Sequence, residues 1–278
     1  MDTWLLTFET TLRLGIFLTL LILMASLEIR FPRRSPLALH AGKSTLISRF
    51  NNLGLAASST LIMKLLLPLS LASFALYCQN NQWGLLNQPR INALALPGFL
   101  TLLTSLLIFD LIIYWQHRLF HKIPIFWQLH KVHHSDINLD VSTGIRFHPI
   151  EILLSQLIKF SVIFIFGFSI TSVIVFEILL NALALFNHSN VRLPLRLDFW
   201  LRKIIVTPDM HRVHHSKIWQ EHNSNFGFNI SLWDKVFHSY QDQPKLGHQH
   251  IDIGLPQYND SDTPLRFSQL LIMPFKKH

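Results

Sequence analysis

Long apolar stretches alternate with short polar and basic segments along the first two thirds of the chain. The first three apolar stretches cover residues 12–27, 53–77 and 98–114. A helix of about 20 apolar residues crosses a bilayer, so each stretch predicts a membrane-crossing helix. The second stretch is the weakest of the three because Lys64 and Pro68 interrupt it. No basic segment precedes the first stretch and no small-residue cleavage site follows it, so we expect a retained helix and not a removed signal peptide.

A fourth apolar region, Ile152 to Phe186, is long enough for two helices. It carries only two charged residues, Lys159 and Glu177, and Gly167 lies near its middle. This pattern predicts a hairpin that enters and leaves the same side of the membrane, which makes five crossings in all. Lysine and arginine accumulate on cytoplasmic flanks, and placing the basic segments there puts the N-terminus on the opposite side. Residues 117–151 and 187–278 are then cytoplasmic.

The composition supports a membrane-embedded body. Half of the 278 residues are hydrophobic and only 14% are charged, where a soluble domain has about 25%. The single cysteine, Cys78, excludes an internal disulfide and a thiolate metal cage. The net charge of +8 fits basic flanks that face anionic lipid. Nucleic-acid binding is not expected, because no basic stripe is interleaved with aromatic residues. We therefore expect one all-α domain over residues 1–278, an integral membrane bundle of about four to six helices with a cytoplasmic histidine-rich cap.

Three histidine motifs stand out among the 16 histidines of the chain. They read HRLFH from His117, HKVHH from His130 and HRVHH from His211. Histidines four apart share one face of a helix, whereas adjacent histidines differ by about 100°. In each HxxHH motif, two rings can therefore converge on one ion while the neighbouring ring points to another. The spacing favours two metal ions over one.

A lone histidine in an apolar chain is usually a hydrogen-bonded core residue. We expect this ordinary role for His40, His222, His238, His248, His250 and His278. The same explanation for the three motifs would need a separate partner for each of eight buried rings, which is costly. Imidazole suits iron, zinc, copper and nickel, and so many nitrogen ligands exceed the needs of one ion. Two redox-active ions beside a bilayer suggest oxygen activation on a lipid chain.

Three further polar residues are candidates for orienting the ligands or the substrate. Asp110 lies two helical turns before His117, about 10 Å along the helix axis, so it is not expected to bind the same ion. We expect it to accept an N–H from a histidine of an HxxHH motif, with a polar contact to Arg118 or to the backbone as the alternative. His148 is a candidate for ligand support or substrate positioning. Asn225 either orients a ligand ring or occupies a turn before a glycine.

The motifs together resemble those of the fatty acid hydroxylase / sterol desaturase superfamily. The resemblance covers about Asp110 to Tyr240 and includes DLIIYWQHRLFH, RFHPIE, VTPDMHRVHHS and NSNFGFNISLWDKVF. It implies a non-haem di-iron oxygenase that uses O2, with its histidines in a cytoplasmic cap on a membrane body. It also implies a further ligand at His188, where the alternative is a hydrogen-bonded histidine at the membrane boundary. The expected ligands are His117, His121, His130, His133, His134, His188, His211, His214 and His215.

Several functional questions stay open at the level of sequence. The chain contains no GxGxxG fingerprint, so electrons are expected from a separate reductase, ferredoxin or cytochrome b type carrier. Sterol, sphingolipid, fatty acyl, ether lipid and carotenoid substrates all remain compatible, with hydroxylation favoured over desaturation. A histidine-rich divalent metal transporter is one alternative, although its ligands would lie near mid-bilayer on broken helices. A membrane zinc hydrolase is another, although it would need a carboxylate base such as the one in HExxH.

Overall fold

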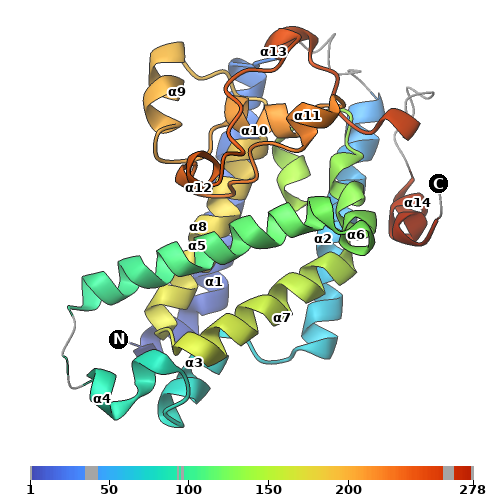
Figure 1. Cartoon of the computed structure of the whole chain (residues 1–278). Coiled ribbons are helices and arrows are strands. Elements are labelled where there is room, and N and C mark those ends of the chain that lie inside the picture. Colours follow the sequence, from blue (N-terminus) through green and yellow to red (C-terminus); the bar gives the residue numbers. More distant parts are fainter. Residues whose placement is uncertain (1, 35–42, 93, 95–96, 259–265, 277–278) are drawn as a thin grey trace.

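The computed structural model describes residues 2–34, 43–92, 94, 97–258 and 266–276. The regular elements in this part of the chain are all helices, with isolated β-bridges and no strand. The expectation of an all-α fold is therefore confirmed. Figure 1 shows long helices in the lower part of the molecule and shorter helices above them.

Five helical stretches are long and apolar enough to cross a membrane. They are formed by α1 (Asp2–Arg30), α2 with α3 (Lys43–Leu66 and Leu71–Asn80), α5 (Gly98–Lys122), α7 (Pro149–Phe166) and α8 (Ile170–His188). The number of crossings agrees with the expectation from the apolar pattern, so the protein is a multi-pass membrane protein. The short helix α4 (Pro89–Asn92) lies between α3 and α5.

Two local signals shape these spans. Pro68 lies in the break between α2 and α3, and the Ser70 side chain caps α3 by accepting from the Ser73 N–H at 3.0 Å. Gly167 ends α7 with φ +72°, in the left-handed region that glycine adopts without strain. A Cβ on Gly167 would lie 2.6 Å from the Asn87 side chain. The α7–α8 hairpin therefore turns where the sequence predicts it.

The charged residues inside the hairpin are paired with each other and with α1. Lys159 Nζ lies 2.7 Å from Glu177 Oε1, and Arg13 Nη1 lies 2.7 Å from Glu177 Oε2. Arg13 also contacts Glu9 at 2.9 Å. An ionised side chain within a membrane span is unfavourable unless it has such a partner. The ion pairs thus hold α1, α7 and α8 together and account for the charges in an otherwise apolar region.

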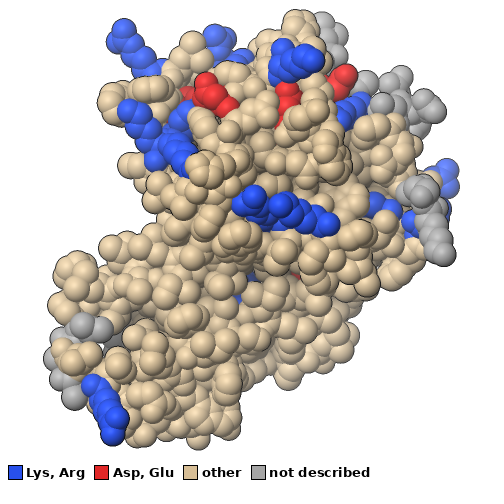
Figure 2. Space-filling view, in the orientation of Figure 1, with Lys and Arg blue, Asp and Glu red and all other residues tan. Residues whose placement is uncertain are grey.

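The shorter helices form a cap at one end of the spans. The cap comprises α6 (Pro124–His134), a 3₁₀ turn (Val141–Ile145) and the elements after α8. These elements are α9 (Leu195–Leu201), α10 (Pro208–His214), α11 (Trp219–His222), α12 (Leu232–Val236), α13 (Gly247–His250) and α14 (Phe267–Ile272), with 3₁₀ turns at Pro256–Tyr258 and Met273–Phe275. A further 3₁₀ turn, Leu85–Asn87, lies between α3 and α4 and outside the cap. The N-terminal end of the chain lies at the opposite end of the spans from α10 and α11 (Figure 1). On the face drawn in Figure 2, lysine, arginine and acidic side chains gather mainly over the cap, and the lower body shows few of them.

An apolar core places α5 and α8 in register below the cap. The Phe109 ring of α5 stacks on the Phe176 ring of α8 with centroids 4.5 Å apart, and it also contacts Phe168 at 4.9 Å. Both helices continue upward from this contact, and α5 ends in the HRLFH motif while α8 ends at His188. The packing of the two spans therefore carries histidines from distant parts of the sequence to the same level.

Candidate metal centre

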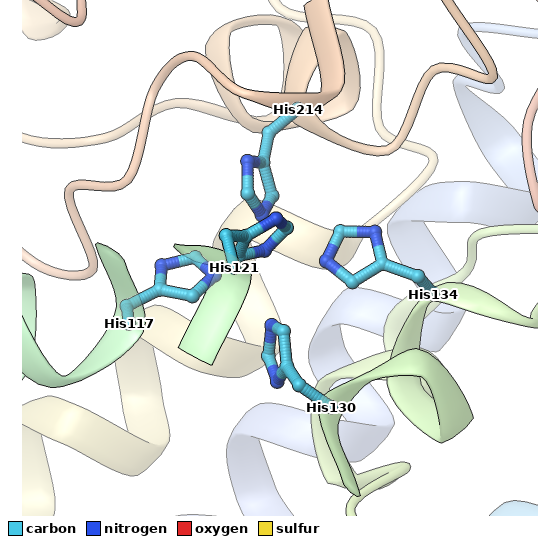
Figure 3. A group of neighbouring side chains, drawn as sticks. All are labelled: His117, His121, His130, His134 and His214. Atoms are coloured by element: carbon cyan, nitrogen blue, oxygen red, sulfur yellow. The ribbon is translucent and has the colours of Figure 1, made fainter. Parts of the chain in front are cut away.

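A first group of imidazoles gathers where α5, α6 and α10 meet. It contains five buried histidines whose candidate ligand nitrogens all lie within 4.8 Å of one another, and these are His117, His121, His130, His134 and His214. Figure 3 shows their rings directed toward a common centre from separate parts of the ribbon. His117 and His121 share one face of α5, as their spacing predicts.

A second group of four buried histidines adjoins the first. Its members are His133, His188, His211 and His215, again with ligand nitrogens within 4.8 Å of one another. The rings of His134 in the first group and His215 in the second stack with centroids 4.5 Å apart. Each HxxHH motif thus contributes to both groups, in the division that the 100° step between adjacent residues predicts.

Hydrogen bonds donated by Nδ1 orient two of the rings in each group. His117 donates to the Phe226 carbonyl at 2.8 Å and His214 to the Ser224 carbonyl at 2.7 Å. In the second group, His133 donates to the Arg146 carbonyl at 3.2 Å and His188 to the Ala184 carbonyl at 2.7 Å. An imidazole that donates from Nδ1 carries its lone pair on Nε2. These bonds therefore select the tautomer that a metal ion requires.

The lone pairs in the second group face each other. His133 Nε2 and His188 Nε2 are 3.0 Å apart, and His188 Nε2 is also 3.0 Å from His211 Nε2. Since Nδ1 of His133 and of His188 both donate to carbonyls, the neutral rings have no proton to share between their Nε2 atoms. Two lone pairs at this distance repel each other unless a cation attracts both. The donor set therefore fits a metal ion.

Unpartnered nitrogens in the first group lead to the same conclusion. Nε2 of His130, Nε2 of His214 and both ring nitrogens of His121 and of His134 are buried without a hydrogen-bond partner. Leaving a buried polar group without a partner costs about 1–3 kcal/mol. Several such atoms around one point are accounted for if a metal ion binds them.

Burial also keeps six imidazoles of the two groups neutral. Loss of hydration lowers the pKa of these rings well below the ordinary value of 6.5, with a further decrease from neighbouring imidazoles; the rings concerned are His130, His133, His134, His211, His214 and His215. A metal ion competes with protons for imidazole nitrogen. Rings that stay unprotonated at neutral pH are prepared for metal binding.

Asn225 supports the first group through the backbone. Its φ of 52° places it in the left-handed region, and its side chain bonds to the carbonyls of Met210 and Gln241 at 2.9 and 2.8 Å. The carbonyls on either side of it, from Ser224 and Phe226, are the acceptors for His214 and His117. Asn225 thus occupies a turn before a glycine, which is one of the two interpretations from the sequence. It orients two rings only indirectly, because the turn positions the carbonyls that accept from His214 and His117.

Asp110 does not take the expected contact with a histidine. Its Oδ2 accepts from the Trp233 indole at 2.8 Å and from the Ile230 N–H at 3.2 Å. The expected hydrogen bond from a histidine of an HxxHH motif to Asp110 is therefore wrong. The carboxylate faces α12 and the residues just before it, so it anchors that part of the cap to α5. The donor Trp233 belongs to α12.

His148 has a local role outside the two groups. Its Nδ1 accepts from the Ile150 N–H at 3.2 Å and caps α7, while Nε2 donates to the Leu271 carbonyl at 3.1 Å. Contact with a ligand ring is not among its interactions. The motif RFHPIE contributes a different residue, because Glu151 Oε1 accepts from His130 Nδ1 at 2.6 Å. The sequence signal for Glu151 was an acidic residue in the first turn of an otherwise apolar helix.

His222 is the histidine whose position the sequence did not predict. Its ring centroid lies 4.5 Å from that of His134 and 4.8 Å from that of His121. Trp127 contacts the same rings, 4.9 Å from His222 and 5.2 Å from His121. Trp127 and His222 together form part of the wall around the first group.

The other histidines outside the motifs lie away from the centre or outside the described residues. His248 bonds to Gln243 Oε1 at 3.1 Å, which agrees with an ordinary hydrogen-bonded role. His238 is exposed and has a φ of 55°. His40 and His278 lie outside the residues that the structure describes.

The fold and the centre define a class: a multi-pass helical membrane protein with two adjoining histidine groups suited to metal ions. A sequence model described as fatty acid hydroxylase matches residues 102–239, which contain all nine histidines of the two groups. Through this region the chain belongs to the fatty acid hydroxylase family.

Curated relatives agree with this placement. Ornithine lipid hydroxylase OlsE of Rhizobium tropici is 30% identical over 160 residues, which cover 56% of this chain and 46% of the relative. Alkylglycerol monooxygenase of Homo sapiens is 28% identical over 144 residues, covering 46% of this chain and 28% of the relative. The chain thus spans less than half the length of these relatives. No solved structure matches the chain significantly.

Proposed function

We propose that the protein is a membrane-bound non-haem di-iron oxygenase that hydroxylates a lipid with O2 and external electrons. The observation that carries this proposal is the pair of adjoining groups, with five and four buried imidazoles. Imidazole ligands suit iron, and two ions fit the division better than one. We assign the nine histidines as the ligands, with His117, His121, His130, His134 and His214 at one ion and His133, His188, His211 and His215 at the other.

The residues around the ions hold the ligands and exclude water. Nδ1 of His117, His130 and His214 donates to backbone carbonyls or to Glu151, and these hydrogen bonds orient the three rings before any metal binds. The Phe147 ring covers His133 at a centroid distance of 4.4 Å with parallel planes, and Trp127 borders the first group. Two bound irons would supply the oxidising power to activate dioxygen and break an unactivated C–H bond, which acid–base side chains lack.

The position of the centre and the names of the relatives support a lipid substrate. The two groups lie at the ends of α5 and α8, where the spans meet the cap. An acyl or alkyl chain in the bilayer would therefore lie near the two groups. The relatives are named as an ornithine lipid hydroxylase and as alkylglycerol monooxygenases. A polar lipid with a long saturated chain is therefore the substrate class that we propose, and hydroxylation is the reaction.

The competing functions have less support from the geometry. A transporter would hold its ligands near mid-bilayer on broken helices, whereas these groups lie at span ends and in the cap. A zinc hydrolase would need a carboxylate base at the ion, and the described members of both groups are histidines. Electrons are proposed to come from a separate reductase, ferredoxin or cytochrome b type carrier. The cap is proposed to face the cytoplasm, as the positive-inside rule indicates.

The reaction can be tested by lipid analysis in a host that makes the protein. Membrane lipids from cells with the wild-type chain should show a class whose mass is higher by one oxygen atom, compared with cells that contain the His134→Ala variant. In cells supplied with isotopically heavy dioxygen, the added atom should carry the heavy isotope. An unchanged lipid profile with two irons bound per chain, or an oxygen derived from water, would contradict the proposal.

A further inference from the structure

Helix α9 has its polar and apolar faces reversed relative to a cap helix that faces water. Its acidic residue Asp198 is 5% exposed and pairs with Arg202, which is also 5% exposed and binds Asp242 at 2.6 Å. Its large apolar residues point away from the protein, with exposed fractions of 46% to 76% for Leu195, Leu197, Phe199 and Trp200. A helix on a soluble surface buries its apolar side and exposes its charges. The opposite arrangement indicates an apolar environment outside α9.

Helix α12 repeats the pattern beside α9. Asp234 is fully buried, while Leu232 and Val236, four residues apart, are 46% and 51% exposed. The two elements are joined because the Ser231 hydroxyl donates to the Arg202 carbonyl at 2.7 Å and the Ser231 N–H to the Ile204 carbonyl at 3.1 Å. Together α9, Ile204 and α12 present one apolar surface, which we call the α9–α12 surface.

The α9–α12 surface continues onto a membrane span. The Phe237 ring, directly after α12, lies 5.0 Å from the ring of Trp115 on α5, and Trp115 is 39% exposed. At its other end, α9 begins seven residues after α8 ends at His188. The connecting segment is bonded to the end of α1, because the Arg192 N–H donates to the Phe31 carbonyl at 2.8 Å. The surface therefore starts where two spans end and reaches the flank of a third.

Basic side chains border this surface. Arg192, Arg196, Lys203 and Lys235 are exposed, and Lys203 Nζ lies 3.7 Å from the centroid of the Trp200 ring. Figure 2 shows blue side chains around tan surface where α9 lies in Figure 1. Aromatic and leucine side chains with lysine and arginine beside them are typical of helices that lie in the membrane interface.

We propose that the α9–α12 surface is immersed in the lipid interface, with its apolar side chains among the acyl chains and its basic residues at anionic headgroups. A lipid surface explains the buried acidic residues as well as the exposed apolar ones, and it explains the continuity with α5. A docking site for a soluble acidic protein would present charge at its rim but would have no need to join the flank of a span. This proposal does not depend on the reaction that the centre catalyses.

Spin labels on the full-length protein can test the immersion. Cys78→Ala removes the native cysteine, and Trp200→Cys then carries the label in nanodiscs of phosphatidylcholine and phosphatidylglycerol. The matched control is Trp219→Cys, because Trp219 on α11 is 70% exposed and lies outside the surface. Collision with oxygen, which concentrates in lipid, is compared with collision with a water-soluble nickel chelate.

The label at residue 200 should collide more with oxygen than with the chelate, and the label at residue 219 should show the reverse. A chelate accessibility at residue 200 equal to that at residue 219 would overturn the proposal and would indicate a soluble partner for this surface. Replacing both Arg196 and Lys203 by glutamate should lower the oxygen preference at residue 200 when phosphatidylglycerol is present. An unchanged preference in that variant would contradict the role given to anionic headgroups.

Discussion

Glu151 gives a direct test of how the cap tunes the first group of ligands. It is 3% exposed, and its Oε1 accepts from His130 Nδ1 at 2.6 Å. A carboxylate behind a ligand histidine fixes the ring and increases its basicity. Glu151→Gln keeps the size and an acceptor oxygen but removes the charge, so His130 should bind metal less tightly while the fold is retained.

The expected magnitude follows from this single contact. Replacing such a partner weakens metal affinity by about 10- to 100-fold, which corresponds to about 1.4–2.7 kcal/mol. The loss should be confined to one of the two ions, because Glu151 bonds to His130 of the first group, whereas His133 and His188 of the second group bond to backbone carbonyls. A chelator competition with Co(II), followed by its visible absorption, measures the two affinities separately.

Asp110→Asn is the matched control for this experiment. Asp110 is also buried and carboxylic, but its hydrogen bonds go to Trp233 and Ile230. We expect metal affinities within about twofold of the wild-type values, since a twofold change is only about 0.4 kcal/mol. Wild-type affinity in Glu151→Gln, or an equal loss in both variants, would refute the reasoning.

Three further predictions concern orientation, acid stability and the wall of the centre. A cysteine at Gln243 should resist a membrane-impermeant reagent added to intact cells, and its modification would reverse the proposed topology. Burial lowers the pKa of His248 from 6.5 to about 4, although the nearby carboxylate of Asp209 acts in the opposite direction. Between these pH values the unfolded chain binds a proton that the folded chain does not bind. The free energy of unfolding therefore decreases as the pH falls, by up to about 1.4 kcal/mol per pH unit. His248→Gln should therefore flatten the loss of thermal stability of the metal-free protein from pH 6.5 to 4, and an equally steep loss would argue against this assignment. His222→Phe should retain both ions because His222 lies outside the two ligand groups, and loss of one ion would make it a ligand.

Local patterns in the sequence were sufficient to predict the membrane spans and the division of the histidines into two groups. Apolar length predicted five crossings, and Gly167 marked the hairpin because its turn needs a left-handed residue. The division of each HxxHH motif follows from helix geometry alone. Such features depend on neighbours within a few residues, so no tertiary information was needed.

Contacts between distant segments were not predictable in the same way. The partner of His130 is Glu151, 21 residues away, and the partner of Asp110 is Trp233, 123 residues away. Spacing on one helix placed Asp110 on the ligand face but could not tell which segment packs there. His222 follows its motif by seven residues, and only the fold of the intervening loop brings it to His134. The role of His148 as the N-terminal capping residue of α7 had a local signal, because a proline at the first helical position often follows a capping residue.

The central claim is that two ions bind in two separate histidine groups. Iron should be counted per chain after anaerobic reconstitution with Fe(II), in the wild-type protein and in His134→Ala and His215→Ala, which each remove one ring from a different group. We expect two irons in the wild-type protein and about one in each variant. A single iron in the wild-type protein, or two irons in both variants, would contradict it.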